Sequence, residues 1–184
     1  DSMKKAMYFA FREIERIQGI MSVQIDTTEA SRINHYAGVS PVKVSPELYS
    51  IISRSIDYSK KYNGIFDLTI GPVSELWGFS SDKKITELPD RNLLDSLVKL
   101  VDYKMIILDP EDTSVFLIKK GMKIDLGGIA KGYAVDRASE VMKQYGMNDF
   151  FVNAGGDIYA SGSKSSGQKW SIGIKDPRDE KKII

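Results

Sequence analysis

Cysteine is absent from this 184-residue chain, and histidine occurs only once. Without cysteine the chain forms no disulfide, thiolate metal site or iron–sulfur cluster, and it has no cysteine nucleophile. The single histidine, His35, excludes a metal motif that takes two histidines from this chain. An isolated histidine among polar loop residues is usually a surface residue, and we assign His35 no role.

An excess of charge of one sign is also missing. The 26 Lys and Arg residues against 25 Asp and Glu residues give a formal net charge of +1, so no strong field favours nucleic acid or an anionic membrane. No apolar run approaches the roughly 18 to 20 residues that span a bilayer, and no transmembrane segment or secretory leader is expected in the chain. The 42% hydrophobic and 28% charged residues are typical of a globular domain.

Apolar residues recur at helical spacing in four segments. The predicted helices are residues 3–21, a segment that starts at Ser45-Pro46 and ends before Gly64, residues 90–101 with their leucines inward, and residues 130–145 capped by Gly146. Predicted strands are residues 105–108 and 115–118, joined as a hairpin, then 122–126, 150–152, 158–160 and 170–174, with another beginning at 181–184. This mixture predicts a single domain of the α/β (or α+β) class.

The strongest candidate for chemistry is residues 123–134, where a predicted strand meets a helix at Gly127-Gly128. Paired glycines let backbone N–H groups approach a ligand, and a helix N-terminus attracts anions. Lys131 would add a full positive charge for phosphate oxygens, and Asp125 could accept from a sugar or base or help to hold a metal. The alternative is a plain strand-to-helix turn whose glycines only ease packing.

A second candidate is the glycine-punctuated segment 63–79, which we expect to be mostly loop. Aromatic residues and Asp67 on loops suit a flat heteroaromatic ligand. The interpretation we favour from composition alone is that Phe66, Trp77 and Phe79 fill the core.

Two further groups have simpler explanations. Residues 153–157, Asn-Ala-Gly-Gly-Asp, form either a hairpin turn or a second backbone cradle for a ligand. Asp109, Glu111 and Asp112 lie at the tip of the first predicted hairpin, where we interpret them as solvated turn residues.

Together these segments resemble the ApbE family of FAD:protein FMN transferases. The matching residues are 66–72 with 76–79, 124–136, and 153–157, with weaker agreement at 21–22, 31–34 and 44–48. The resemblance implies the family's own α/β fold, a mixed sheet with flanking helices, and not a Rossmann domain. It also implies that residues 1–184 are one ApbE-like domain that lacks its C-terminal part.

The resemblance further implies a set of site residues. Those assigned to FAD are Gln24, Ile65, Phe66, Asp67, Asp125 and Lys131. Gly128 would offer its backbone carbonyl to Mg²⁺, and no catalytic residue is assigned. At Gln24 the family commonly has an aromatic residue. The family's histidine near the chemistry, and the carboxylate and threonine that complete its metal site, lie beyond the segment that matches residues 170–174.

The implied reaction is a Mg²⁺-dependent transfer of FMN. A Ser or Thr hydroxyl of a target flavoprotein attacks the FMN-side phosphorus of FAD, and AMP leaves. The acceptor would be a flavoprotein subunit of a membrane electron-transfer complex, at the periplasmic or extracytoplasmic face of the bacterial inner membrane, where the family includes lipoproteins. The alternatives are an FAD-hydrolysing or FAD-binding relative, or an inactive fragment without the C-terminal metal ligands.

Overall fold

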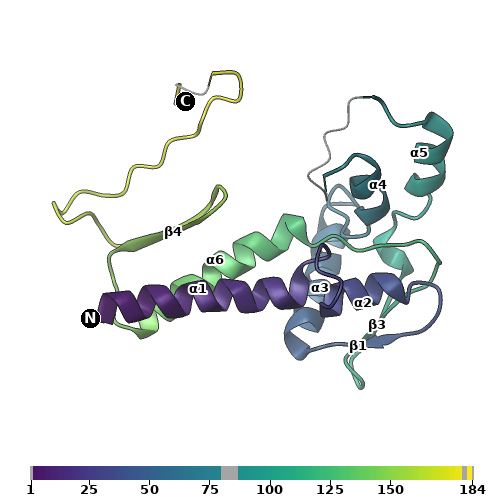
Figure 1. The fold of residues 1–184 in the computed structure, drawn as a ribbon, viewed down its shortest axis with the longest axis horizontal. Helices are drawn as coiled ribbons and strands as arrows, with labels where there is room; N and C mark the ends of the chain where they lie inside the picture. Colours follow the sequence, from purple (N-terminus) through teal and green to yellow (C-terminus); the bar gives the residue numbers. More distant parts are fainter. Residues whose placement is uncertain (1, 80–86, 180–181, 184) are drawn as a thin grey trace. The chain divides into compact units, whose positions relative to one another are not determined.

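The computed structural model of the chain describes residues 2–79, 87–179 and 182–183 (Figure 1). The chain divides into two compact units. The central unit is Ile14–Ala134, and the terminal unit combines Asp1–Glu13 with Val135–Ile184. Two helices, α1 (Ser2–Met21) and α6 (Gly127–Gln144), contribute residues to both units. Whether residues 1–184 constitute one domain therefore stays a prediction.

The central unit contains most of the regular structure. Its elements are α2 (Glu29–His35), β1 (Val42–Lys43), α3 (Pro46–Lys61), α4 (Gly71–Leu76), α5 (Arg91–Val98), a 3₁₀ turn (Tyr103–Met105), β2 (Ile106–Asp109) and β3 (Ser114–Leu117). The three strands form an antiparallel sheet in the order β1-β3-β2. The hairpin predicted from the sequence is confirmed as β2 and β3, with Ile106 opposite Leu117.

The main core lies in the central unit, and α3 contributes one buried stripe to it. Ser45 caps this helix by accepting the Leu48 N–H at 3.3 Å, and Pro46 occupies its first turn, as predicted. Leu48, Ile51, Ile52 and Ile56 form the buried stripe of α3, which packs with Ile124 and other aliphatic residues. Burial of such aliphatic side chains is the main driving force for folding.

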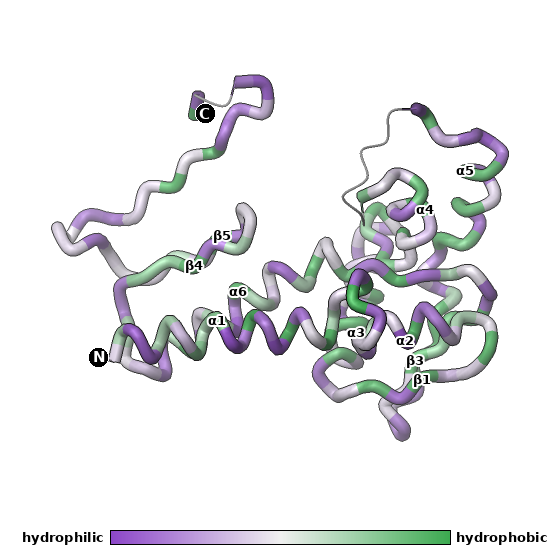
Figure 2. Tube along the Cα trace, in the orientation of Figure 1, coloured by the Kyte–Doolittle hydropathy of each residue, from purple (hydrophilic) through white to green (hydrophobic). Residues whose placement is uncertain are grey.

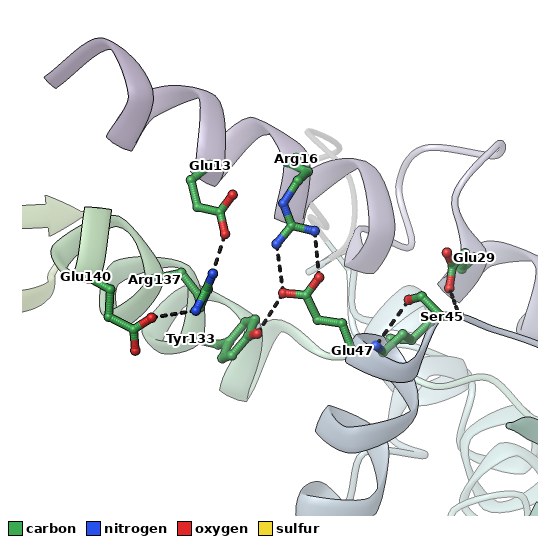
Figure 3. Close-up of polar contacts among 9 residues, drawn as sticks. Glu13, Arg16, Glu29, Ser45, Glu47, Tyr133, Arg137 and Glu140 are labelled. Carbon is green, nitrogen blue, oxygen red and sulfur yellow. Dashed lines mark hydrogen bonds and ion pairs between the residues drawn. The ribbon is translucent and has the colours of Figure 1, made fainter. Parts of the chain in front are cut away.

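A polar cluster joins three helices within the central unit (Figure 3). Glu47, in the first turn of α3, accepts hydrogen bonds from both Arg16 terminal nitrogens at 2.6 and 2.8 Å. The Tyr133 hydroxyl donates to the same carboxylate at 2.6 Å. The fork of an arginine matches the two oxygens of a carboxylate, so this contact fixes the orientation of α1 against α3.

The terminal unit contains the antiparallel hairpin β4 (Phe150–Ala154) and β5 (Asp157–Ser161). Gly155 and Gly156 form its turn with φ angles of +61° and +105°, which glycine adopts without strain. The Gly156 N–H donates to the Asn153 side-chain oxygen at 2.9 Å. The hairpin interpretation of residues 153–157 is therefore confirmed, and a ligand-binding role for this turn stays a prediction.

Two helical segments also belong to the terminal unit, and specific contacts join them. The Phe9 ring stacks on Tyr145 at 5.5 Å between centroids, and Arg137 donates to Glu13 at 3.2 Å (Figure 3). Hydrophobic and hydrophilic residues alternate along α1 (Figure 2). Gly146 follows α6 with φ +79° and donates its N–H to the Lys143 carbonyl, which confirms the predicted C-terminal cap.

Two predicted strands are absent from the described residues. Within residues 122–126, Lys123 makes an isolated bridge with Ile70. The Asn34 side chain bonds to both backbone groups of Ile124, and the Asp125 N–H donates to the Leu68 carbonyl, so these groups are not used for a strand ladder. Residues 170–174 form no strand there, and Trp170 makes a side-chain contact, from its indole N–H to the Ser161 carbonyl at 2.8 Å. Of the strand start predicted at 181–184, residues 181 and 184 lie outside the described residues, and Ile183 makes an isolated bridge with Lys175.

Two predicted helices differ from the structure in their limits. The helix predicted at 90–101 is α5, which ends at Val98 and has no buried residue. Its leucines were expected inward, but Leu93 is 46% exposed because so short a helix covers little of the core. The helix predicted at 130–145 begins at Gly127, so Gly127-Gly128 belongs to its first turn. Segment 63–79 was expected to be loop over much of its length, and this is confirmed, since within it only α4 (Gly71–Leu76) is helical.

The predicted α/β class is confirmed, since helices combine with small sheets. Sequence reasoning missed α2 and β1, which are seven and two residues long. Among the described helices, none is both long enough and apolar enough to cross a bilayer.

Candidate functional site

Segment 122–128 leads from the core to the start of α6. Met122, Ile124 and Leu126 are buried, whereas Lys123 and Asp125 between them are half-exposed. This alternation is that of a strand, with one face toward the core and the other toward solvent. Lys123 and Asp125 therefore lie on one side of the segment, directly before the N-terminus of α6.

The Asn34 side chain holds this segment in place of a strand partner. The Ile124 N–H donates to the Asn34 side-chain oxygen at 2.7 Å, and the Asn34 nitrogen donates to the Ile124 carbonyl at 3.0 Å. A side-chain amide has one donor and one acceptor group in the geometry of a peptide, so it satisfies both backbone groups of one residue. Asn34 thus fixes the backbone immediately before Asp125.

Asp125 lies between two hydrogen-bond donors. One carboxylate oxygen accepts the Gly127 N–H at 2.8 Å, and the other accepts the Ser74 hydroxyl at 3.0 Å. The Asp125 N–H donates to the Leu68 carbonyl at 2.7 Å. The carboxylate therefore satisfies one free amide at the start of α6, and its negative charge is favourable at this end of the helix dipole.

The Phe66 ring lies against the first turn of α6. A Cβ atom added to Gly128 would come within 3.1 Å of a Phe66 ring carbon. Glycine at position 128 thus allows an aromatic face to approach the helix N-terminus closely. Both Gly127 and Gly128 are exposed. The Gly127 N–H donates to Asp125, and the Ile129 and Ala130 N–H groups donate to the Leu126 carbonyl, so among the described residues the Gly128 N–H is the amide of this first turn that remains for a ligand. An exposed helix N-terminus of this kind favours anionic oxygens.

Asp67 organises the loop that presents Phe66. One of its oxygens accepts from the Thr69 N–H at 2.8 Å and the Thr69 hydroxyl at 2.6 Å, and the other accepts the Tyr103 N–H at 2.9 Å. Ile65, at the tip of the loop, is 92% exposed. The structure gives Asp67 a definite structural role, and its contact with FAD stays a prediction.

Helix α4 packs against the same segment. A Cβ added to Gly71 would lie 2.6 Å from the Lys123 carbonyl oxygen and 2.8 Å from the Lys123 Cβ. The Lys123 ammonium pairs with Glu75 at 2.5 Å. Gly71 is buried, so the close approach depends on its lack of a side chain. Sequence reasoning missed Ser74, Glu75 and Asn34 as site residues, because a single polar residue does not reveal its distant partner.

We expect Gly71→Ala to lower the free energy of unfolding by about 1 to 3 kcal/mol, because the backbone must move away from Lys123. Urea unfolding followed by circular dichroism measures this loss. The matched control is Gly132→Ala within α6, where an added Cβ meets nothing within 4 Å. This control should be neutral or stabilising, since alanine is the better helix former. Equal stability of the two variants would contradict the packing argument.

The favoured interpretation of the three aromatic residues as core residues is wrong. Phe79 is 79% exposed, and Phe66 and Trp77 are half-buried outside the main core. Aliphatic residues fill that core, while Phe66 lies against the start of α6 and Trp77 and Phe79 follow α4 in the chain. Their exposure favours the other interpretation, in which the loop meets a flat ligand.

The remaining predicted residues lie at the surface. Lys131 is exposed on α6, one turn beyond the Gly127-Gly128 pair. Gln24 is exposed between α1 and α2, and within the described residues its side chain makes no hydrogen bond. The structure therefore brings Phe66, Asp125 and Gly128 together, puts Lys131 on the same helix, and shows no contact of Gln24 with them.

The three acidic residues of the first hairpin and His35 were expected at the surface, and the structure agrees. Asp109, Glu111 and Asp112 are exposed at the β2–β3 turn, and His35 is exposed, although it ends α2 and is not in a loop. In the part of the chain that the structure describes, no three His, Cys, Asp or Glu residues are grouped so that they could hold a metal ion.

The comparisons with known proteins agree on one family. The model of the ApbE family matches residues 3–184. The chain is 33% identical over 169 residues to an FAD:protein FMN transferase of Klebsiella pneumoniae, covering 91% of this chain and 50% of that protein. It is 31% identical over 172 residues to one of Haemophilus influenzae, covering 90% and 50%. The chain thus spans about half the length of the curated relatives it matches.

Solved structures give the same result. The crystal structure of an ApbE protein from Thermotoga maritima is 34% identical and superposes with a TM-score of 0.89. The match covers 98% of this chain and 58% of that one.

Proposed function

The chain belongs to the ApbE family, and on this basis we propose that it forms the FAD-binding part of an FAD:protein FMN transferase. The observation that supports this most directly is the start of α6, where the Asp125 carboxylate caps the Gly127 amide and the Phe66 ring lies against the exposed Gly128. A flavin dinucleotide offers a diphosphate, hydroxyl groups and flat rings, and these three features suit amides, a carboxylate and an aromatic ring.

In this proposal each residue has a distinct part. The Gly128 amide at the start of α6 and the Lys131 ammonium bind the diphosphate oxygens. The Asp125 carboxylate, which has lone pairs beyond the two already used, accepts from a ligand hydroxyl or ring N–H. Phe66 contacts a ring face, with Ile65 beside it. The acceptor hydroxyl loses its proton to solvent as its oxygen bonds to the FMN-side phosphorus, the bond from that phosphorus to the bridging oxygen breaks, and AMP leaves with the bridging oxygen.

Magnesium would neutralise the diphosphate when bound, but the described residues do not by themselves fit a Mg²⁺ site. Gly128 is the second residue of α6, so its carbonyl points along the helix and accepts an intrahelical bond. The positive end of the helix dipole also disfavours a cation. Mg²⁺ takes six oxygen ligands, and among the side chains described around Gly128 the carboxylate oxygens come from Asp125. The Mg²⁺ dependence and the Gly128 ligand stay predictions.

The acceptor and the location belong to the same proposal. We infer from the resemblance that the acceptor is a flavoprotein subunit of a membrane electron-transfer complex. The reaction would take place at the extracytoplasmic face of a bacterial membrane.

Two measurements test the proposal. Titration of the chain with FAD, followed by flavin fluorescence, should saturate at one FAD per chain. Incubation with FAD, Mg²⁺ and a threonine-containing acceptor peptide should then add the mass of one FMN to the peptide and release AMP. Absence of FAD binding by the folded chain would refute the proposal.

A second candidate function is FAD binding without turnover. It requires only the contacts at the start of α6, where Asp125 and Phe66 lie. Saturable FAD binding without FMN addition to the peptide would support it over the transferase.

A further inference from the structure

Ser74 on α4 contacts the carboxylate at the centre of the proposed site. Its hydroxyl donates to Asp125 at 3.0 Å, across 51 residues of sequence. We propose that Ser74 is a positioning residue: it holds the Asp125 carboxylate so that one oxygen caps α6 while free lone pairs remain for the ligand. The proposal rests on the FAD-binding function, and it assigns to Ser74 a role in that site.

The geometry of Asp125 supports this role. A carboxylate has about four lone-pair positions, of which Gly127 and Ser74 occupy one on each oxygen. Donors on both oxygens restrict rotation of the carboxylate. Without the Ser74 hydroxyl only the Gly127 amide would hold it, and the carboxylate could rotate about that bond. A ligand would then have to order the carboxylate, which lowers affinity.

Ser74 is itself held firmly. It is 9% exposed and lies in α4, which Gly71 brings against the Lys123 backbone. The neighbouring Glu75 pairs with Lys123, two residues before Asp125. Because α4 contacts the segment at both residues, its serine has a fixed position relative to Asp125.

The direction of the hydroxyl distinguishes Ser74 from the other buried helical serines described. Ser55, Ser59 and Ser139 donate to carbonyls four residues earlier in their own helices. Such bonds satisfy a buried hydroxyl locally. Ser74 donates to a charged side chain on another segment, and hydrogen bonds to charged groups are the stronger class.

The test compares Ser74→Thr with Ser74→Val, which have the same shape and differ in the hydroxyl. Ser74→Ala removes the hydroxyl without adding volume. We expect the alanine and valine variants to bind FAD about 5- to 10-fold more weakly than the wild type. The threonine variant should bind more tightly than the valine variant by a similar factor. Ser96→Ala, on exposed α5, is the control and should bind FAD like the wild type.

Amide hydrogen exchange of Gly127 tests the positioning role without FAD. Exchange at Gly127 should be faster in the alanine and valine variants than in the wild type and the threonine variant. Equal FAD affinity and equal Gly127 exchange in the threonine and valine variants would overturn the inference while leaving the proposed function intact. Wild-type chain that binds no FAD would refute the function, and with it the role of Ser74 in FAD binding.

Discussion

Asn34→Ala is expected to lower the free energy of unfolding by about 2 to 6 kcal/mol, because it leaves two backbone groups of Ile124 without partners. Ile124 is fully buried, and Asn34 supplies both a donor and an acceptor to its backbone. Each unsatisfied buried group costs about 1 to 3 kcal/mol. FAD affinity should fall as well, since the backbone before Asp125 loses its fixed position. Urea unfolding measures the first effect and FAD titration the second.

Two variants make this result specific. Asn34→Asp keeps an acceptor for the Ile124 N–H but places an oxygen against the Ile124 carbonyl, so it should also destabilise the chain. His35→Ala, at the exposed next position of α2, should change stability by less than about 0.5 kcal/mol. A loss below about 1 kcal/mol for Asn34→Ala would show that the Ile124 backbone finds other partners.

Lys131→Ala is expected to weaken FAD binding about 10- to 100-fold, which corresponds to the roughly 1.5 to 3 kcal/mol of a charge-assisted contact. Lys131 is exposed, so the free energy of unfolding should stay within about 0.5 kcal/mol of the wild type. Added salt should weaken FAD binding by the wild type more than by the variant, because salt screens an exposed charge. Isothermal titration at two salt concentrations measures both effects.

A matched pair of lysine variants controls for charge. Lys119→Ala removes the same charge from another exposed position of the central unit and should leave FAD binding unchanged. Lys131→Arg retains the charge and should bind FAD more tightly than Lys131→Ala. If Lys131→Ala binds FAD as tightly as the wild type, Lys131 does not belong to the site, although the family membership stands.

Local signals predicted the helices and hairpins well. Ser45 with Pro46 marked the start of α3, and Gly146 marked the end of α6, because capping and left-handed turns involve residues close in sequence. The strand at residues 122–126 was predicted wrongly for the opposite reason. Its alternating burial is real, but a strand also needs a partner, and here the partner is the Asn34 side chain.

The candidate site shows the same division. The sequence alone identified the residue types that suit a dinucleotide, at Phe66, Asp125 and Lys131, and it identified the family through three motifs. It could not show that Asp67 bonds to Tyr103, because a carboxylate requires donors without specifying which ones. The exposure of the aromatic rings was likewise misjudged, since burial depends on which other residues fill the core.

The sequence by itself determined the family, the α/β class and the helix ends that depend on neighbouring residues. The tertiary structure alone decided that Asn34 holds Ile124 across 90 residues and that Ser74 holds Asp125 across 51. The physical reason is that a polar side chain encodes a need for hydrogen bonds, while the path of the folded backbone decides which distant group meets it.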